Sequence, residues 1–313
     1  MFSKDELLSG VYGFIVGDAL GVPVEFSSRK ALKANPVFDM EEMGTHKQPK
    51  GTWSDDTSMV LATMEAMSRN IWSTGTIMDN FYRWLYKAEF TATGTVFDVG
   101  GTTARAIENY RMGENIESCG GNSIMDNGNG SLMRILPLVY YVYATWGAHI
   151  TPASVSFINH ISSLTHAHTI SKQSCVYYVY AGISIMKYGK KLGLKNALML
   201  ALKDVDIYYG KAIPNFDYKG ILKRSEADIK SSGYVVDSLE ACLWCLCNTK
   251  SYKEAVLKAV NLGEDTDTIG ALTGGLAGLY YGKKAIPVEW IKELKNKELI
   301  NSICDKFCSN FFM

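Results

Sequence analysis

Residues 263–282 read GEDTDTIGALTGGLAGLYYG, an acidic and hydroxyl-rich beginning followed by a glycine-rich apolar run. Three acids fall within four residues, at the start of a predicted helix over 266–281. The glycines of this helix recur every four residues and therefore share one face: Gly270, Gly274, Gly278 and Gly282. The apolar run is too short to span a membrane. Because this face carries no side chains, we expect another backbone to approach it closely.

A second acidic and hydroxyl-rich cluster, Ser54-Asp55-Asp56-Thr57, opens another predicted helix. Capping alone would explain one such cluster, since Ser54 is a good N-cap and acids favour the positive end of a helix dipole. Two helix starts crowded with carboxylates exceed what capping requires. Carboxylate and hydroxyl oxygens are ligands of magnesium, calcium and manganese. If the clusters face each other, they could hold two divalent ions about 3.5–4 Å apart.

Helical periodicity dominates the chain, which predicts an all-α fold. The predicted helices are 55–69, 77–90, 98–111, 130–146, 169–188, 193–204, 234–247, 251–261, 266–281 and 288–301. Alternating apolar and polar residues are rare, and the β-prone run VYYVY (176–180) lies inside a longer apolar segment that we interpret as helix. No linker divides the chain, so we predict one domain over 1–313. Two loops, 112–130 and 205–233, are expected to border the active site.

The composition restricts the class of partner. Lys plus Arg and Asp plus Glu both number 32 among 313 residues, which argues against a nucleic-acid binder that uses bulk charge but leaves room for a small anionic ligand. Seven irregularly spaced cysteines do not form a disulfide pattern. Cys242, Cys245 and Cys247 lie in an apolar run and are interpreted as buried residues rather than as zinc ligands. With neither a signal peptide nor a membrane span evident, we expect a cytoplasmic protein.

The segment GDALGVPVEF (17–26) places a carboxylate after a helix. Pro23 ends the preceding helix, so Glu25 lies in an irregular segment beside Phe26. Spacing alone favours a solvated loop carboxylate here.

The segment GNGSLMR (128–134) is a glycine-rich turn that leads into a helix. Free backbone N–H groups and the positive end of a helix dipole make such a turn a general anion site, to which Arg134 would add charge. A P-loop is excluded because no Gly-Lys-Ser/Thr follows.

The segment THAH (165–168) carries two histidines two residues apart. At this spacing His166 and His168 do not share a helix face, and the pair is not the zinc signature of metalloproteases. One buried, hydrogen-bonded histidine and one surface histidine would explain it equally well.

Taken together and in order, the motifs resemble the ADP-ribosylglycohydrolase family, the relatives of the dinitrogenase reductase-activating glycohydrolase. The series is GDALG followed by Glu25, WSDDTSM (53–59), DVGGTT (98–103), GNGSLMR, THAH, SGYVVDSLEACLW (232–244) and GEDTDTIGALTGGLAG (263–278). The resemblance is strongest over 11–282. The two acidic motifs, about 200 residues apart and joined by GNGSLMR, are the most specific part.

The resemblance implies a compact orthogonal helical bundle with two magnesium or manganese ions at the base of a cleft. The implied metal ligands are Ser54, Asp55, Asp56, Asp265, Asp267 and Thr268. Glu25 and Asp56 are the implied catalytic carboxylates, with their acid and base roles left open. The diphosphate and ribose would be held by Gly100, Gly101, Gly128, Asn129, Gly130, Ser131, Met133 and Arg134. His166 would approach the ribose, and Tyr234 the acceptor.

Three positions depart from the family pattern. Ser54 stands where many relatives have Thr, and it keeps the hydroxyl group. Glu264 stands where Gly is frequent and adds a carboxylate next to the site. Gly101 stands where a polar residue is frequent, which puts its contact with the ligand in doubt.

The function implied is hydrolysis of the N- or O-glycosidic bond between ADP-ribose and an acceptor, with ADP-ribosyl-arginine on a protein as the first candidate. One alternative is a hydrolase of a free derivative such as O-acetyl-ADP-ribose. Others are a non-catalytic ADP-ribose-binding protein and a helical protein whose acids serve only as caps. The partner is accordingly an ADP-ribosylated protein or a small molecule that contains ADP-ribose.

Overall fold

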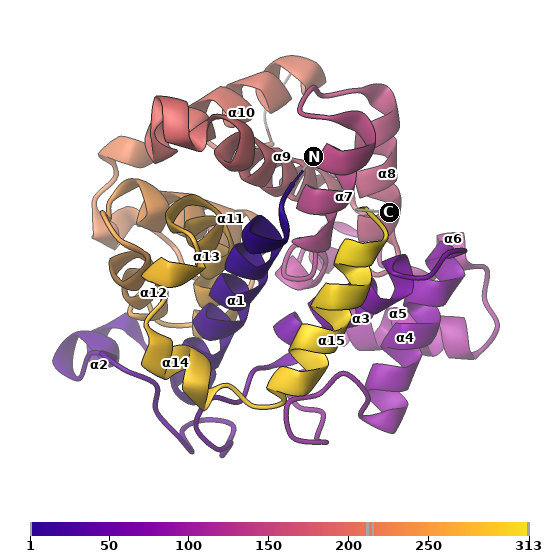
Figure 1. The fold of residues 1–313 in the computed structure, drawn as a ribbon, viewed down its shortest axis with the longest axis horizontal. Helices are drawn as coiled ribbons and strands as arrows, with labels where there is room; N and C mark the ends of the chain where they lie inside the picture. Colours follow the sequence, from indigo (N-terminus) through magenta and orange to yellow (C-terminus); the bar gives the residue numbers. More distant parts are fainter. Residues whose placement is uncertain (1, 211–212, 215, 312–313) are drawn as a thin grey trace.

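The fold is built from helices in the computed structural model, which describes residues 2–210, 213–214 and 216–311 (Figure 1). The α-helices are α1 (Lys4–Gly21), α2 (Arg29–Ala34), α3 (Asp55–Met67), α4 (Thr74–Lys87), α5 (Gly101–Arg111), α6 (Ile116–Cys119), α7 (Pro137–Trp146), α8 (Pro152–Ser163), α9 (Thr169–Leu192), α10 (Leu194–Tyr209), α11 (Val235–Cys247), α12 (Tyr252–Val260), α13 (Thr266–Tyr281), α14 (Val288–Glu293) and α15 (Lys297–Ser309). Short 3₁₀ turns include η1 (Val22–Val24), η2 (Ile124–Asp126), η3 (Asn129–Ser131), η4 (Ile221–Lys223), η5 (Glu226–Asp228) and η6 (Lys283–Ala285). The described residues form isolated bridges but no strand, so the predicted all-α class is confirmed.

Helices α1 and α13 pack directly against each other at the centre of the bundle (Figure 1). A Cβ added to Gly17 would lie 2.0 Å from the carbonyl oxygen of Gly270, and one added to Gly13 would lie 2.3 Å from that of Gly274. A Cβ at Gly278 would lie 2.1 Å from the Ser9 carbonyl oxygen. The predicted close approach at the α13 glycines is therefore confirmed in a seam of backbone on backbone. Gly282 does not take part, because it ends α13 at φ 81° with open space around it.

The core extends from this pair to helices on both sides. Helices α11 and α12 lie on one side of α1, and α3, α4 and α5 lie on the other (Figure 1). Helix α9 carries the buried run VYYVY, which confirms its interpretation as helix. The segment Lys4–Val24 is long and apolar enough to cross a membrane, but 89% of its most apolar window is buried inside the fold. That helix, rather than 269–282, is the strongest membrane-like segment, and it serves here as a core helix.

Several predicted boundaries were wrong for local reasons. The helix predicted over 130–146 begins only at Pro137, which favours the first turn of a helix, and is preceded by η3. The helix predicted over 288–301 is two helices, because Asn296 adopts a left-handed φ of 51° between them. Helix α5 starts at residue 101 rather than 98, since Asp98 has a φ of 54°. Helix α8 was not predicted.

The predicted loops are only partly irregular. The loop over 112–130 contains α6 and η2, and the start of the loop over 205–233 continues α10 to Tyr209. Residues 211–212 and 215 of that loop lie outside the described residues. All seven cysteines are free, and Cys242 and Cys245 are buried within α11. The single-domain assignment stays a prediction.

Candidate active site

The start of α3 is anchored by a carboxylate that the sequence analysis did not single out. Asp18 lies on α1 and is fully buried. Its carboxylate accepts hydrogen bonds from the backbone N–H of Ser54 (2.9 Å) and from the N–H and hydroxyl of Thr57 (3.1 and 2.5 Å). Burial raises the pKa of Asp18 to about 6, although these hydrogen bonds favour the charged form. Asp18 thus ties the acidic N-terminus of α3 to the central helix pair.

The acidic starts of α3 and α13 face each other. Ser54 Oγ and Thr268 Oγ1 each donate to Asp56 Oδ2, both at 3.2 Å. The backbone N–H of Thr268 donates to Asp267 Oδ1 at 2.9 Å. The glycine seam accounts for this meeting, since a Cβ at Gly21 would lie 2.3 Å from the Asp267 backbone. Two motifs about 200 residues apart therefore form one cluster.

This cluster contains more negative charge than the described residues satisfy. Asp56 Oδ1 and Asp267 Oδ2 are buried and have no hydrogen-bond partner among those residues. Burial, and then the neighbouring carboxylates, raise the pKa values of Asp55, Asp56 and Asp267 well above the ordinary range. Unpartnered carboxylate oxygens that repel one another are what a hard divalent cation would neutralise. The donor set therefore fits a hard divalent cation.

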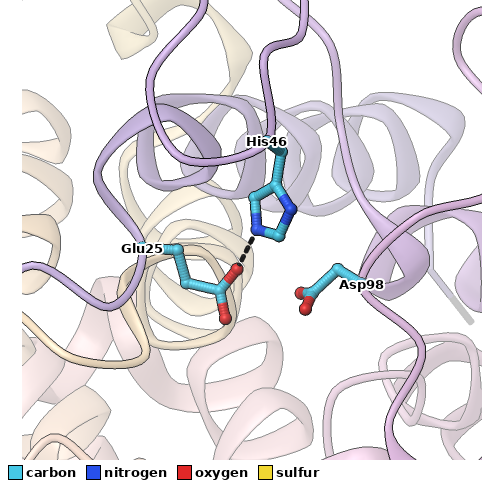
Figure 2. A group of neighbouring side chains, drawn as sticks. All are labelled: Glu25, His46 and Asp98. Carbon is cyan, nitrogen blue, oxygen red and sulfur yellow. Dashed lines mark hydrogen bonds and ion pairs between the residues drawn. The ribbon is translucent and has the colours of Figure 1, made fainter.

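Glu25, His46 and Asp98 form a neighbouring group, in which Glu25 is buried and the other two are half-buried (Figure 2). His46 Nε2 is paired with Glu25 Oε2, and the Asp98 carboxylate faces Glu25 across a gap (Figure 2). Burial raises the pKa of Glu25 to about 7, and pairing with Glu25 raises that of His46. The His46 ring lies beside Phe97, with ring centroids 5.1 Å apart. Glu25 is thus a buried, paired carboxylate rather than the solvated one that spacing alone favoured.

Two sets of carboxylates lie close enough to share a cation. In each set, one oxygen per residue lies within 4.8 Å of the others: Asp55, Asp98 and Asp267 form one, and Glu25, Asp265 and Asp267 the other. The sequence analysis missed His46 and Asp98 as site residues. Asp98 begins the quoted segment DVGGTT and could have been found there, whereas no quoted motif contains His46.

A cavity of about 310 Å³ lies above the carboxylate floor. It brings together many of the predicted site residues, namely Glu25, Asp55, Asp56, Gly100, Gly101, Gly128, Asn129, Gly130, Met133, His166, Asp265 and Thr268. Asn129 Nδ2 links the glycine-rich segment to the floor by donating to Asp265 Oδ2 at 2.6 Å and to Ser238 Oγ at 2.9 Å. Helix α5 begins at this wall at Gly100, with no side-chain cap on its first N–H groups. Uncapped N–H groups at a helix start can bind an anion.

Other predicted residues lie outside the cavity lining. Ser54 and Asp267 are buried and do not line the cavity, and Ser131 is fully buried, where it accepts a hydrogen bond from Ser162. The Arg134 guanidinium is also fully buried, and Nη2 donates to the Ile161 carbonyl at 3.0 Å. The sequence analysis expected Arg134 to add positive charge at the anion site. In this arrangement its guanidinium does not contact a ligand in the cavity.

Two further residues that the sequence analysis placed at or next to the site, Tyr234 and Glu264, do not line the main cavity. Tyr234 is 38% exposed and lines a separate cavity of about 220 Å³ with Asp237 and Glu240. Glu264 is exposed, with a left-handed φ of 64°, and does not line the main cavity.

The helical fold and this carboxylate-floored cavity agree with the comparison with known proteins: the chain belongs to the ADP-ribosylglycohydrolase family, whose model matches residues 3–312. It is therefore a hydrolase, and the family predicted from the motifs is confirmed. The chain is 29% identical over 311 residues to the ADP-ribosylarginine hydrolase Tri1 of Serratia proteamaculans (strain 568), covering 97% of this chain and 79% of that protein.

Two further similarities cover nearly the whole chain. Identity to the ADP-ribosyl-[dinitrogen reductase] glycohydrolase of Rhodospirillum rubrum is 31% over 314 residues, or 94% of this chain and 91% of that protein. A solved structure described as an ADP-ribosylglycohydrolase-related protein complex matches with a TM-score of 0.77 at 27% identity, covering 97% of each chain.

Proposed function

We propose that this protein hydrolyses the N-glycosidic bond between ADP-ribose and an arginine side chain of a modified protein, and that it requires two magnesium or manganese ions. The observation that carries the proposal is the pair of facing helix starts, whose buried carboxylates hold oxygens without partners among the described residues at the floor of a cavity. The names of the Serratia and Rhodospirillum relatives support an ADP-ribosylated protein as the substrate class.

Six residues are the proposed metal ligands: Ser54, Asp55, Asp56, Asp265, Asp267 and Thr268. Asp98 is a further candidate because its carboxylate lies within 4.8 Å of those of Asp55 and Asp267. When bound, the ions would orient the ribose hydroxyls and lower the pKa of a water molecule. The diphosphate is proposed to lie against the uncapped start of α5 and the segment 128–130, which line the same cavity.

Proton transfer is assigned to Glu25. Its carboxyl group lines the cavity and is not among the six proposed metal ligands, so it can exchange a proton with a bound substrate or water molecule. It can accept a proton from the attacking water or donate one to the departing guanidine, while His46 holds its orientation. Asp56 is less suited to this role because it is one of the proposed metal ligands, and a carboxylate bound to a cation is a weaker base.

The test is release of ADP-ribose from an arginine-ADP-ribosylated protein with magnesium, with manganese and with chelator. Serine-linked protein and O-acetyl-ADP-ribose are assayed in parallel. We expect metal-dependent release from the arginine-linked substrate. Preferential release from either other substrate would overturn the arginine assignment, and binding of ADP-ribose without any turnover would indicate a non-catalytic protein.

The two-metal proposal has its own test in Asp56→Ala and Asp267→Ala. Each variant should lose turnover while its circular dichroism spectrum remains that of the wild type. Asp204→Ala is a suitable control, because Asp204 is an exposed aspartate on α10. Metal-dependent turnover retained in Asp56→Ala or Asp267→Ala would remove the two-metal model.

A further inference from the structure

Three buried polar side chains form a line from the core to the wall of the cavity. Arg134 Nη2 donates to Thr165 Oγ1 at 3.0 Å, and Thr165 Oγ1 lies 2.9 Å from His166 Nδ1. Arg134 and Thr165 have no exposed surface, and His166 is 2% exposed. The other edge of the imidazole ring borders the cavity beside Gly128 and Gly130. The line therefore connects a buried charge to a ring at the ligand site.

The chemistry of the donors fixes the direction of these hydrogen bonds. A guanidinium can only donate, so Thr165 Oγ1 is the acceptor towards Arg134. The hydroxyl has one proton left to donate, and His166 Nδ1 is its remaining partner. If Nδ1 carried a proton instead, two donors would point at one oxygen and the hydroxyl proton would be buried without an acceptor. Leaving a buried donor unsatisfied is unfavourable, so Nδ1 is the acceptor.

The imidazole is also held neutral. Burial lowers the pKa of His166 to about 3, and the neighbouring Arg134 charge acts in the same direction. A neutral ring whose Nδ1 accepts must carry its proton on Nε2. Nε2 has no hydrogen-bond partner among the described residues, although the ring lines the cavity.

We propose that Arg134 is a positioning residue that acts through Thr165 to fix His166 as the Nε2–H tautomer, so that the cavity presents a permanent neutral hydrogen-bond donor to an oxygen of ADP-ribose. The hydrogen-bond acceptor for His166 Nε2–H is a ribose hydroxyl or a diphosphate oxygen of ADP-ribose. His166 in this state cannot act as a general base at the cavity. The binding part of this inference rests on the proposed function, which places ADP-ribose in this cavity.

Two features around the line support this role. Arg134 Nε and Nη1 have no hydrogen-bond partner among the described residues. The hydrogen bonds of the guanidinium itself therefore do not explain why an arginine is buried here. The Phe81 ring, 4.9 Å away, partly stabilises the buried charge. At the cavity end of the line, a Cβ on Gly130 would lie 2.7 Å from His166 Cε1. Glycine at position 130 therefore leaves room for the imidazole ring.

The first test reads the tautomer directly in the wild-type protein without ligand. The ¹⁵N chemical shifts of the imidazole distinguish a protonated ring nitrogen from a bare one, and the His166→Gln spectrum assigns the signal. We expect Nε2 protonated and Nδ1 bare throughout pH 6 to 8. A protonated Nδ1, or a ring that titrates in this range, would overturn the proposal whether or not the protein hydrolyses ADP-ribosyl-arginine.

The second test removes the connecting hydroxyl. Thr165→Val should give a mixture of tautomers and weaken ADP-ribose binding about tenfold by calorimetry. Thr165→Ser should restore both the tautomer and the affinity. Thr63→Val is the matched control, since this buried hydroxyl donates to the Met59 carbonyl of its own helix. An unchanged tautomer and affinity in Thr165→Val would refute the line, whereas a wild-type protein that fails to bind ADP-ribose would count against the proposed function alone.

Discussion

Neutralising one carboxylate of the acidic cluster should stabilise the metal-free protein while it removes activity. Asp267→Asn is the informative change because the amide has nearly the same shape as the carboxylate. Asp267 is fully buried, its Oδ1 accepts from the Thr268 N–H, and its Oδ2 has no partner among the described residues. Burial, and then Glu25, Asp56 and the other carboxylates, raise its pKa well above 3.8. Without metal, this carboxyl group therefore destabilises the fold at neutral pH.

The size of the effect follows from the buried oxygen, because a buried polar group without a partner costs about 1 to 3 kcal/mol, and more when it is charged. The amide NH₂ group that replaces one carboxylate oxygen must find acceptors among the neighbouring carboxylates, so we expect a net gain of about 1 to 3 kcal/mol. For a chain of this length, that corresponds to a rise of roughly 2 to 5 °C in melting temperature.

The assay is thermal unfolding of the wild type and Asp267→Asn, each with chelator and with excess magnesium or manganese. With chelator the variant should melt higher; with metal the wild type should gain stability and the variant should gain much less. Asp204→Asn, which changes an exposed aspartate, should leave both melting temperatures nearly unchanged. A metal-free variant that melts below the metal-free wild type would refute the reasoning about mutual repulsion.

Three further outcomes follow from the same structure. Lowering the pH from 8 to 6.5 should stabilise the wild type in chelator by about 1 to 3 kcal/mol, because the raised carboxyl pKa values make the fold bind more protons than the unfolded chain does. Excess metal should abolish this pH dependence of the unfolding free energy, measured by urea unfolding. The pH range stops at 6.5 because the lowered pKa of buried His166 destabilises the fold at lower pH. Gly17→Ala should lower the free energy of urea unfolding by about 3 kcal/mol and weaken metal binding, because its Cβ would lie 2.0 Å from the Gly270 carbonyl oxygen. Gly75→Ala in α4, whose Cβ would have its nearest contact at 3.3 Å, should change stability by less than about 1 kcal/mol. Equal losses in the two variants would contradict the close packing of α1 on α13. Glu264→Gly should increase the free energy of unfolding by about 0.5 to 1 kcal/mol and so raise the melting temperature, since a left-handed φ of 64° suits glycine. A lower melting temperature would show that the Glu264 side chain has a stabilising contact.

The sequence predicted the helical class because the periodicity of the apolar residues is a local property. It also indicated which carboxylates and hydroxyls could serve as metal ligands, because the acids and hydroxyls of each cluster are adjacent in the chain. The glycines of α13 predicted a close backbone approach, but their partner on α1 could not be identified, since many helices in the chain contain glycine. Only the packing of the whole chain determines which two helices meet.

The residues that sequence analysis missed act across long separations. Asp18 lies within an apolar helix, and nothing local indicates that it binds the start of α3. His46 lies in an irregular segment and pairs with a carboxylate that looked solvated on spacing alone. Arg134 was assigned to the ligand because it follows a glycine-rich turn, but the turn of η3 directs its side chain into the core. Such errors arise because motifs give residue types and spacing but not side-chain direction.

The backbone seam between α1 and α13 restricts how the site can vary. Where large side chains separate two helices, substitutions can shift their spacing by tenths of an ångström. Here carbonyl oxygens and α-carbons touch directly, so no interposed side chain is available for such adjustment. Sliding one helix along the other would require a step of about four residues, or roughly 6 Å, before glycines met again. The seam therefore restricts changes in the distance between α1 and α13, and with it the position of the acidic start of α13 relative to Asp18 on α1.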